Sequence, residues 1–142
     1  MKKDEQDFDS FEGLPEKVEQ DTSAVGIDFK AGKLRVGKKE LIHQFKSAGL
    51  DTPHIHKGWF NELTGQDVPE HIAFGFLDGD FYSSIIDSLR LVWPHMAAGG
   101  KLVVDDYQRE ALPGVSQALH DFFQTKQVKI EQYGTRAVIL VP

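Results

Sequence analysis

Hydrophobic and polar positions are arranged along this chain in blocks with two different spacings. Blocks in which apolar residues recur about every three to four positions predict helices, and short, nearly continuous apolar runs predict strands buried on both faces. Glycine, proline and aspartate separate the blocks, as is typical of turns. In chain order the predicted elements are a helix at 37–49, a strand at 54–60, a strand at 72–77, a helix at 82–93, a strand at 102–104, a helix at 115–123 and a hairpin of 128–133 with 137–141.

This order of elements predicts an α/β fold with a mostly parallel sheet and a C-terminal antiparallel hairpin. We expect residues 1–142 to form a single domain, because 142 residues with 40% hydrophobic positions can bury most of the surface that the unfolded chain exposes. In open sheets of this kind, ligands bind beyond the carboxyl ends of the strands. Functional residues are therefore expected at those strand ends.

The composition excludes several classes of protein. Cysteine is absent, which excludes a disulfide framework, a thiolate zinc site and a cysteine nucleophile. No apolar run approaches the roughly 20 residues that a membrane helix needs, and the first residues lack the apolar core of a signal peptide. No basic stripe typical of nucleic-acid binding is present. We therefore expect a soluble, cytoplasmic protein with neither a nucleic acid nor a membrane as partner.

The net charge of −6 is concentrated near the N-terminus. Residues 1–21 contain eight acidic residues and three lysines, whereas the rest of the chain is nearly balanced. The segment 1–23 is therefore interpreted as an acidic leader, partly disordered and solvated, around a small apolar island that includes Phe8, Phe11 and Leu14.

Two pairs of aspartates are the strongest candidates for chemistry. Asp78 and Asp80 follow one buried strand, and Asp105 and Asp106 follow the next. If these strands are neighbours, up to four carboxylates converge, and like charges that close raise one another's pKa unless a cation lies between them. Mg²⁺ favours such oxygen ligands, so the pattern predicts a metal or acid–base site. The alternative is that Asp80 merely caps the next helix and that Asp106 is solvated.

Other polar and aromatic residues give weaker signals. His54 and His56 alternate on a strand and share a face, as a metal-binding pair would, but no third ligand lies nearby in sequence, so surface or packing histidines are the stronger explanation. Trp59 with Phe60 could stack on a flat ring at a strand end or pack in the core. The pair Ser83-Ser84 is typical of the first turn of a helix, because no histidine–acid partner is spaced to activate a serine nucleophile.

Several short stretches, taken in order, resemble the macrocin O-methyltransferase family, and together they cover most of residues 8–125. Members of this family are class I methyltransferases that depend on S-adenosylmethionine and Mg²⁺ and methylate sugar hydroxyls in antibiotic pathways. The resemblance implies a Rossmann-like fold and a small, hydroxyl-bearing substrate. The matching stretches are FDSFEGLP at 8–15, KGWF at 57–60, LDGDFYSS at 77–84, GGKLVVDDY at 99–107 and LPG at 112–114 with Asp121-Phe122.

The resemblance also implies a metal site and a catalytic base. Asp78, Asp105 and Asp106 would hold the Mg²⁺ ion, which would fix two neighbouring substrate hydroxyls and lower the pKa of the one that is methylated. Asp78 or Asp80 would accept the proton of that hydroxyl.

A cofactor site follows from the resemblance as well. Asp9, with the adjacent Ser10, falls where class I methyltransferases carry the acid that binds the cofactor ribose. Gly58 and Trp59 fall near the adenine. The segment 8–15 would then be the loop that leaves the family's second strand, rather than part of a solvated leader.

The sequence departs from the family at its start. A class I methyltransferase opens with a strand and a Gly-rich turn that cradles the cofactor, and no Gly-x-Gly occurs anywhere in this chain. The first strand, the first helix and nearly all of the second strand are expected to be missing, which leaves a gap in the sheet. We expect either that 54–60 pairs directly beside 72–78 or that another chain fills the gap, giving a rearranged sheet of about five strands and a homo-oligomer formed through exposed strand edges.

Three functions are compatible with these observations. The first is an O-methyltransferase, or the C-terminal portion of one, that uses S-adenosylmethionine and Mg²⁺. The second is a non-catalytic, truncated methyltransferase-like module for binding or assembly, which the missing Gly-rich turn favours. The third is a nucleotide-sugar enzyme that uses the Asp78-x-Asp80 motif to bind a metal.

Overall fold

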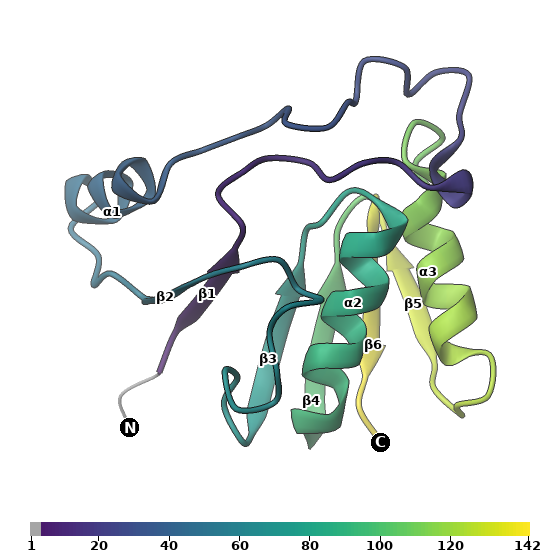
Figure 1. Ribbon diagram of the computed structural model, residues 1–142. Helices are drawn as coiled ribbons and strands as arrows, with labels where there is room; N and C mark the ends of the chain where they lie inside the picture. The colour runs from purple at the N-terminus through teal and green to yellow at the C-terminus, as the bar shows by residue number, and fades with distance from the viewer. Residues whose placement is uncertain (1–3) are drawn as a thin grey trace.

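The computed structural model describes residues 4–142, so the first three residues of the predicted leader lie outside the described residues (Figure 1). Helices and strands alternate along the chain as the spacing of apolar residues predicts, although a strand at 6–9 precedes the predicted elements. The elements are β1 (Gln6–Asp9), η1 (Glu19–Asp21), α1 (Lys38–Ser47), β2 (His54–Lys57), β3 (Ile72–Leu77), α2 (Tyr82–Val92), η2 (Trp93–His95), β4 (Met96–Val104), α3 (Pro113–Phe123), β5 (Ile130–Tyr133) and β6 (Arg136–Leu140).

The strands of residues 4–142 form two sheets instead of the one predicted sheet of about five strands. β1 and β2 pair in parallel as a two-stranded sheet, and the larger sheet has the order β3-β4-β6-β5. In the larger sheet β3 and β4 are parallel, whereas β6 is antiparallel to both of its neighbours. Half of the four strand pairings are thus parallel, so the prediction of a mostly parallel sheet was too strong.

The predicted pairing of 54–60 beside 72–78 is wrong. β2 pairs with β1 instead, in a register that places Gln6 opposite His54. The N–H of His54 donates to the carbonyl oxygen of Glu5 (3.0 Å), and the N–H of Gly58 donates to that of Asp9 (3.0 Å). The segment before Ser10 forms the strand β1, and β1 provides the main-chain hydrogen bonds to β2 that the prediction expected from β3.

The hydrophobic core of residues 4–142 lies between the larger sheet and the two helices that cover one of its faces (Figure 1). Helices α2 and α3 pack against each other on this face, and the alternate residues of β4 and β6 that point toward them are buried. The most deeply buried contributors include Ile85 and Leu89 of α2, Val115 and Leu119 of α3, Leu102 and Val104 of β4, and Ala137 and Ile139 of β6.

The predicted leader is part of the fold rather than a solvated tail over its described residues. Its apolar island is buried at Phe11 and Leu14, and Asp21 is only 2% exposed. The Asp21 carboxylate accepts hydrogen bonds from the N–H of Tyr82 (2.7 Å), the first residue of α2, and from the N–H of Val18 (3.0 Å). The alternative in which Asp80 caps this helix is therefore incorrect, because the cap comes from a residue 61 positions earlier in the chain.

No helix within residues 4–142 is both long enough and apolar enough to cross a membrane.

Candidate functional site

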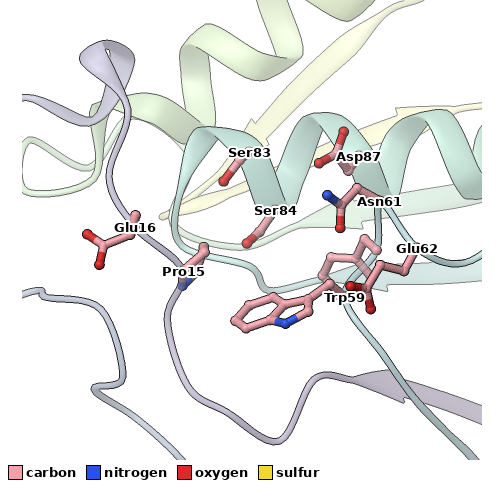
Figure 2. Close-up of a pocket in the computed structure, with 9 residues that line it drawn as sticks. Pro15, Glu16, Trp59, Asn61, Glu62, Ser83, Ser84 and Asp87 are labelled. Atoms are coloured by element: carbon pink, nitrogen blue, oxygen red, sulfur yellow. The ribbon is translucent and has the colours of Figure 1, made fainter.

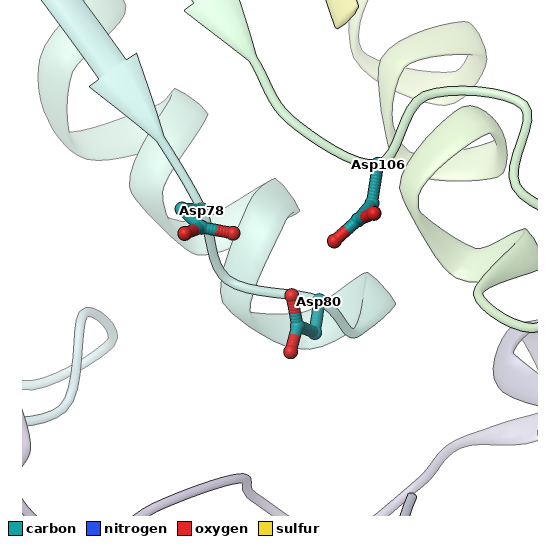
Figure 3. Close-up of side chains that lie close together, drawn as sticks. All are labelled: Asp78, Asp80 and Asp106. Carbon is teal, nitrogen blue, oxygen red and sulfur yellow. The ribbon is translucent and has the colours of Figure 1, made fainter. Parts of the chain in front are cut away.

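Three of the four predicted aspartates come together at the carboxyl ends of β3 and β4. One carboxylate oxygen from each of Asp78, Asp80 and Asp106 lies within 4.8 Å of the others (Figure 3). The two strands are parallel neighbours, with Leu77 opposite Val104, so their ends meet at the same edge of the sheet. This acidic cluster is the one group of three or more metal-ligating side chains found within the described residues.

The cluster is electrostatically strained. Burial and the nearby charges of Asp78 and Asp106 raise the pKa of Asp80 to about 7. Burial and the charges of Asp105 and Asp106 also raise the pKa of Asp78. The backbone is unusual too, because Asp80 (φ 63°) and Asp106 (φ 54°) adopt the left-handed region that few residues other than glycine, asparagine and aspartate tolerate. Such features concentrate at functional sites and favour a proton or a cation among the carboxylates.

Asp105 points elsewhere because of the alternation of side chains along β4. Val104 faces the core, so the next residue projects to the opposite face of the sheet, where it meets Arg136 of β6. The Nε of Arg136 lies 3.2 Å from Oδ1 of Asp105, and Arg109 lies 2.7 Å from Oδ1 of Asp106. The cluster therefore contains Asp80 beside Asp78 and Asp106, whereas the family resemblance implies Asp105 as the third ligand. Which of these aspartates bind a metal ion stays a prediction.

The predicted cofactor residues gather at the ends of β1 and β2. Ser10, Gly58 and Trp59 line a pocket of about 350 Å³, together with Glu12, Lys57 and Glu62. Asp9 is not among the residues that line this pocket. Its Oδ1 accepts a hydrogen bond from the N–H of Phe11 (2.6 Å), and Ser10 Oγ accepts one from the N–H of Glu12 (3.1 Å). Both side chains thus stabilise the turn that leaves β1.

A second pocket of about 300 Å³ lies beside the first and reaches the start of α2. Trp59 and Glu62 border both pockets, and Figure 2 shows the indole of Trp59 below Ser84 on the first turn of α2. Ser83 and Ser84 thus occupy the predicted helix turn and also line this pocket. Sequence reasoning missed its acidic and amide side chains, because the residues Glu16, Asn61, Glu62 and Asp87 come from three separate segments.

The histidines of β2 pack and hydrogen-bond rather than form a metal pair. The ring of His56 stacks on Phe8 with the ring centroids 4.5 Å apart, and its Nε2 lies 3.0 Å from Oε1 of Gln6. His54 Nε2 lies 3.6 Å from Oδ1 of Asp4 at an exposed position. These contacts favour the packing interpretation of the pair.

Solved structures of O-methyltransferases share the fold. The O-methyltransferase NovP matches 96% of this chain with a TM-score of 0.79 at 23% sequence identity, over 59% of its own length. The calicheamicin methyltransferase CalS11 matches 95% with a TM-score of 0.75 at 18% identity, again over 59% of its length. At these identities the likeness concerns the fold.

Sequence relatives agree with this fold. The chain is 33% identical to the 8-demethyl-8-(2,3-dimethoxy-alpha-L-rhamnosyl)-tetracenomycin-C 4'-O-methyltransferase of Streptomyces olivaceus, over 80% of this chain and 44% of the relative. It is 28% identical to the demethyldecarbamoylnovobiocin O-methyltransferase of Streptomyces niveus, over 70% of this chain and 40% of the relative. It is 27% identical to the mycinamicin III 3''-O-methyltransferase of Micromonospora griseorubida, over 80% of this chain and 46% of the relative.

The chain spans a little less than half the length of these curated relatives. The sequence profile of the family described as Macrocin-O-methyltransferase (TylF) matches residues 4–134, which is nearly the whole chain and includes both the acidic cluster and the pockets. The protein therefore belongs to the macrocin-O-methyltransferase family.

Proposed function

We propose that this chain supplies the metal- and substrate-binding part of an O-methyltransferase that transfers a methyl group from S-adenosylmethionine to a hydroxyl of a sugar or another natural product. The observation that carries the proposal is the acidic cluster at the ends of two neighbouring strands, in a chain of the macrocin-O-methyltransferase family. The relatives are named as O-methyltransferases of tetracenomycin, novobiocin and mycinamicin compounds, which supports a hydroxyl-bearing substrate.

The acidic cluster fits Mg²⁺ by its chemistry. Mg²⁺ prefers oxygen ligands and is usually held by one or two carboxylates together with water and substrate oxygens. The pKa of Asp80, raised to about 7, indicates that the cluster does not carry its full negative charge near neutral pH without a cation. Asp78, Asp80 and Asp106 would hold the ion, and Asp105 remains a candidate ligand by family resemblance. The bound ion would lower the pKa of a coordinated hydroxyl.

Asp80 is the proposed proton acceptor, with Asp78 as the alternative. A general base works best when its pKa lies near the operating pH, and the pKa of Asp80 is raised to about 7. Its left-handed backbone conformation turns the chain at the end of β3 and brings its carboxylate beside that of Asp106. In this position it can accept a proton from a hydroxyl held at the cluster.

The two pockets are the proposed place of the methyl donor. Ser10, Gly58 and Trp59 would contact its adenosine part, and the indole of Trp59 offers a flat face on which a purine can stack. Asp9, at the end of β1, would accept hydrogen bonds from ribose hydroxyls. Because the sequence contains no Gly-x-Gly turn to cradle the rest of the donor, we expect binding to this chain to be weak.

A second candidate function is a non-catalytic module for binding or assembly. It is favoured by the absence of a Gly-x-Gly turn from residues 1–142. This candidate predicts Mg²⁺ binding at the acidic cluster without binding of the methyl donor.

Titration calorimetry with MgCl₂ and then S-adenosylmethionine tests the proposal. We expect Mg²⁺ binding in the wild type and in Asp51→Asn, a matched change at an exposed aspartate, but not in the double variant Asp78→Asn with Asp106→Asn. Unchanged Mg²⁺ affinity in the double variant would overturn the metal site. Donor binding separates the two candidates, since no heat at millimolar S-adenosylmethionine would leave only the non-catalytic module. Metal-dependent heat with uridine diphosphate instead would favour a nucleotide-sugar enzyme.

A further inference from the structure

One cation forms an ion pair with the acidic cluster. Of the three carboxylates, Asp106 alone has an ion-pair partner within residues 4–142, and this partner is Arg109. An N–H of the Arg109 guanidinium donates to Oδ1 of Asp106 over 2.7 Å. Arg109 therefore places a fixed positive charge at the position where the sequence and the fold otherwise bring together only negative ones.

The charge of Arg109 also acts on a second carboxylate of the cluster. Burial and the charges of Asp78 and Asp106 raise the pKa of Asp80 to about 7, and the charge of Arg109 acts in the opposite direction. A positive charge that stabilises a carboxylate repels any other cation that binds beside that carboxylate. Arg109 and a divalent ion thus compete for the same negative charge.

The backbone of the loop after β4 holds Arg109 beside the cluster. Asp106 leaves the strand with a φ of 54°, and Gln108 follows with a φ of 56°. The N–H of Gln108 donates to Ser116 Oγ (2.9 Å), and the N–H of Arg109 donates to the carbonyl oxygen of Asp106 (3.4 Å). The chain therefore turns back on itself, which brings the two side chains of the ion pair together outside any helix.

The segment 22–36 fixes the same loop from outside. In Figure 1 this segment, between η1 and α1, passes the loop that precedes α3. Ser23 Oγ donates to the carbonyl oxygen of Glu110 (2.7 Å), and a Cβ atom at Gly26 would overlap the next carbonyl group, that of Ala111. The ring of Phe29 lies 5.9 Å from the guanidinium carbon of Arg109, within the range of a cation–π contact. Arg109 is thus held between an aromatic ring and a carboxylate.

We propose that Arg109 is a built-in counter-ion of the acidic cluster, which neutralises Asp106 while no metal is bound and lowers the affinity of the cluster for a divalent cation. The inference rests on the metal site of the proposed function. It makes Arg109 a positioning residue, because Arg109 acts on the ion through the charge and orientation of Asp106.

The same ion pair has an opposite effect, since it orients the Asp106 carboxylate for a metal ion. The Arg109 side chain is 48% exposed, and an exposed ion pair holds its partner only weakly. The repulsion between Arg109 and a bound ion is proportional to the charge of that ion, so it is doubled for a divalent cation. Repulsion should therefore outweigh orientation, and removal of the Arg109 charge should tighten metal binding.

Calorimetry with MgCl₂ on the full chain tests the direction of this effect. Arg109→Gln should bind Mg²⁺ about tenfold more tightly than the wild type. Arg109→Lys retains the charge and should stay within about twofold of the wild type. Arg90→Gln is the matched control, because Arg90 forms the same i,i+3 pair with Asp87 (3.3 Å), which is outside the cluster, and its loss changes the net charge equally.

A melting experiment gives a readout without metal. In the presence of EDTA, Arg109→Gln should melt about 2–4 °C below the wild type, because the carboxylates then repel one another without their counter-ion. Saturating MgCl₂ should remove most of this difference, since the ion takes over the neutralising role. A deficit that MgCl₂ leaves unchanged would show that Arg109 only stabilises the loop and would overturn the proposal.

The outcomes separate this inference from the proposed function. Mg²⁺ binding by the wild type with equal or weaker binding by Arg109→Gln would overturn the counter-ion role and leave the metal site intact. Binding by Arg109→Gln but not by the wild type would support both. No binding by either protein would overturn both, and equal tightening in Arg90→Gln would assign the effect to net charge and overturn the specific role of Arg109.

Discussion

Asp21, Tyr82 and Gly114 form a contact that links the beginning of the chain to two helices. Asp21 Oδ1 accepts the N–H of Tyr82 at the start of α2, and Gly114 lies directly against the same oxygen at the start of α3. A Cβ atom at position 114 would overlap the Asp21 carboxylate and come within 2.7 Å of the Tyr82 nitrogen. Glycine at 114 is thus required by close approach and not by backbone conformation.

Substitutions at these two positions should destabilise the fold. Asp21→Ala leaves the N–H groups of Tyr82 and Val18 without an acceptor, which should cost about 1–3 kcal/mol of the free energy of unfolding. Gly114→Ala should cost a similar amount, about 1–3 kcal/mol, through overpacking. Urea unfolding measures both. Gly37→Ala is the control, because a Cβ there meets no atom within 4 Å; equal stability of all four proteins would contradict the role of this contact.

Asp80 gives the protein a pH dependence that Mg²⁺ should reverse. The folded-state pKa of Asp80, about 7, is higher than the ordinary value of 3.8, so the folded state binds the proton more tightly than the unfolded state. The stabilisation is fully present below the ordinary value and is lost as the pH rises through about 7. Without metal, the melting temperature should therefore fall between about pH 4 and pH 8.

Mg²⁺ binding requires deprotonated carboxylates, so the increase in melting temperature on adding MgCl₂ should be larger at about pH 8 than at about pH 5. Differential scanning calorimetry at both pH values measures this difference. Asp80→Asn should flatten the pH dependence, whereas Asp51→Asn should retain it. An Mg²⁺ effect that is larger at the lower pH would exclude the acidic cluster as the site.

At the scale of elements, the alternation of side chains at the end of β4 decides which aspartate joins the cluster. Asp105 continues the strand and projects toward Arg136, whereas Asp106 leaves the strand with a positive φ and turns toward Asp78 and Asp80. The apolar runs predicted two buried strands, and the sequence predicted that the carboxylates at their ends converge if these strands are neighbours, which they are. It did not distinguish Asp105 from Asp106, since that depends on a single backbone dihedral angle.

This difference predicts unequal effects of two otherwise identical substitutions. Asp106→Asn should weaken Mg²⁺ binding by about tenfold or more, because it removes a carboxylate from the cluster. Asp105→Asn should weaken it less, because this carboxylate is paired with Arg136 and acts on the cluster only through its charge. Calorimetry with MgCl₂ compares them. A larger loss in Asp105→Asn would instead favour the ligand set that the family resemblance implies.

The local spacing of apolar residues was enough to predict the helices and the hairpin, but it was not enough to predict the pairing of β1 with β2. Helix α2 follows directly from the spacing of Ile85, Ile86 and Leu89, all of which are buried. The strand β1 contains only one apolar residue, Phe8, among four positions, so its sequence resembles an acidic loop. Its pairing depends on hydrogen bonds to a strand about 50 residues later, which no local periodicity records.

At the scale of the whole molecule, the division into two sheets distinguishes a part with a hydrophobic core from a part with few buried residues. The larger sheet with α2 and α3 contains the hydrophobic core, whereas α1 has no buried residue and β2 has none in its four positions. Regions with few buried apolar contacts open locally at a lower free energy than the core. The division also explains why an α/β pattern alone could not reveal the two sheets, since each strand has the same local signature in either arrangement.

Native-state hydrogen exchange should resolve these two parts in the chain alone. Amides of α1 and β2 should exchange through local opening at a low free energy, and those of Leu102, Val104 and Ile139 should exchange only with global unfolding. Exchange at increasing urea concentration measures both free energies. A single common value for all of these amides would show that the molecule unfolds as one unit.

The position of Trp59 between the two pockets has a practical consequence for studying this protein. The chain has two tryptophans, and the other, Trp93, directly follows α2, packs edge-on against Phe123 with ring centroids 4.8 Å apart, and lines neither pocket. Replacing Trp93 by phenylalanine would leave an intrinsic fluorophore at the boundary of both pockets. Its emission would then report occupancy of the pockets directly in the native chain, without a chemical label.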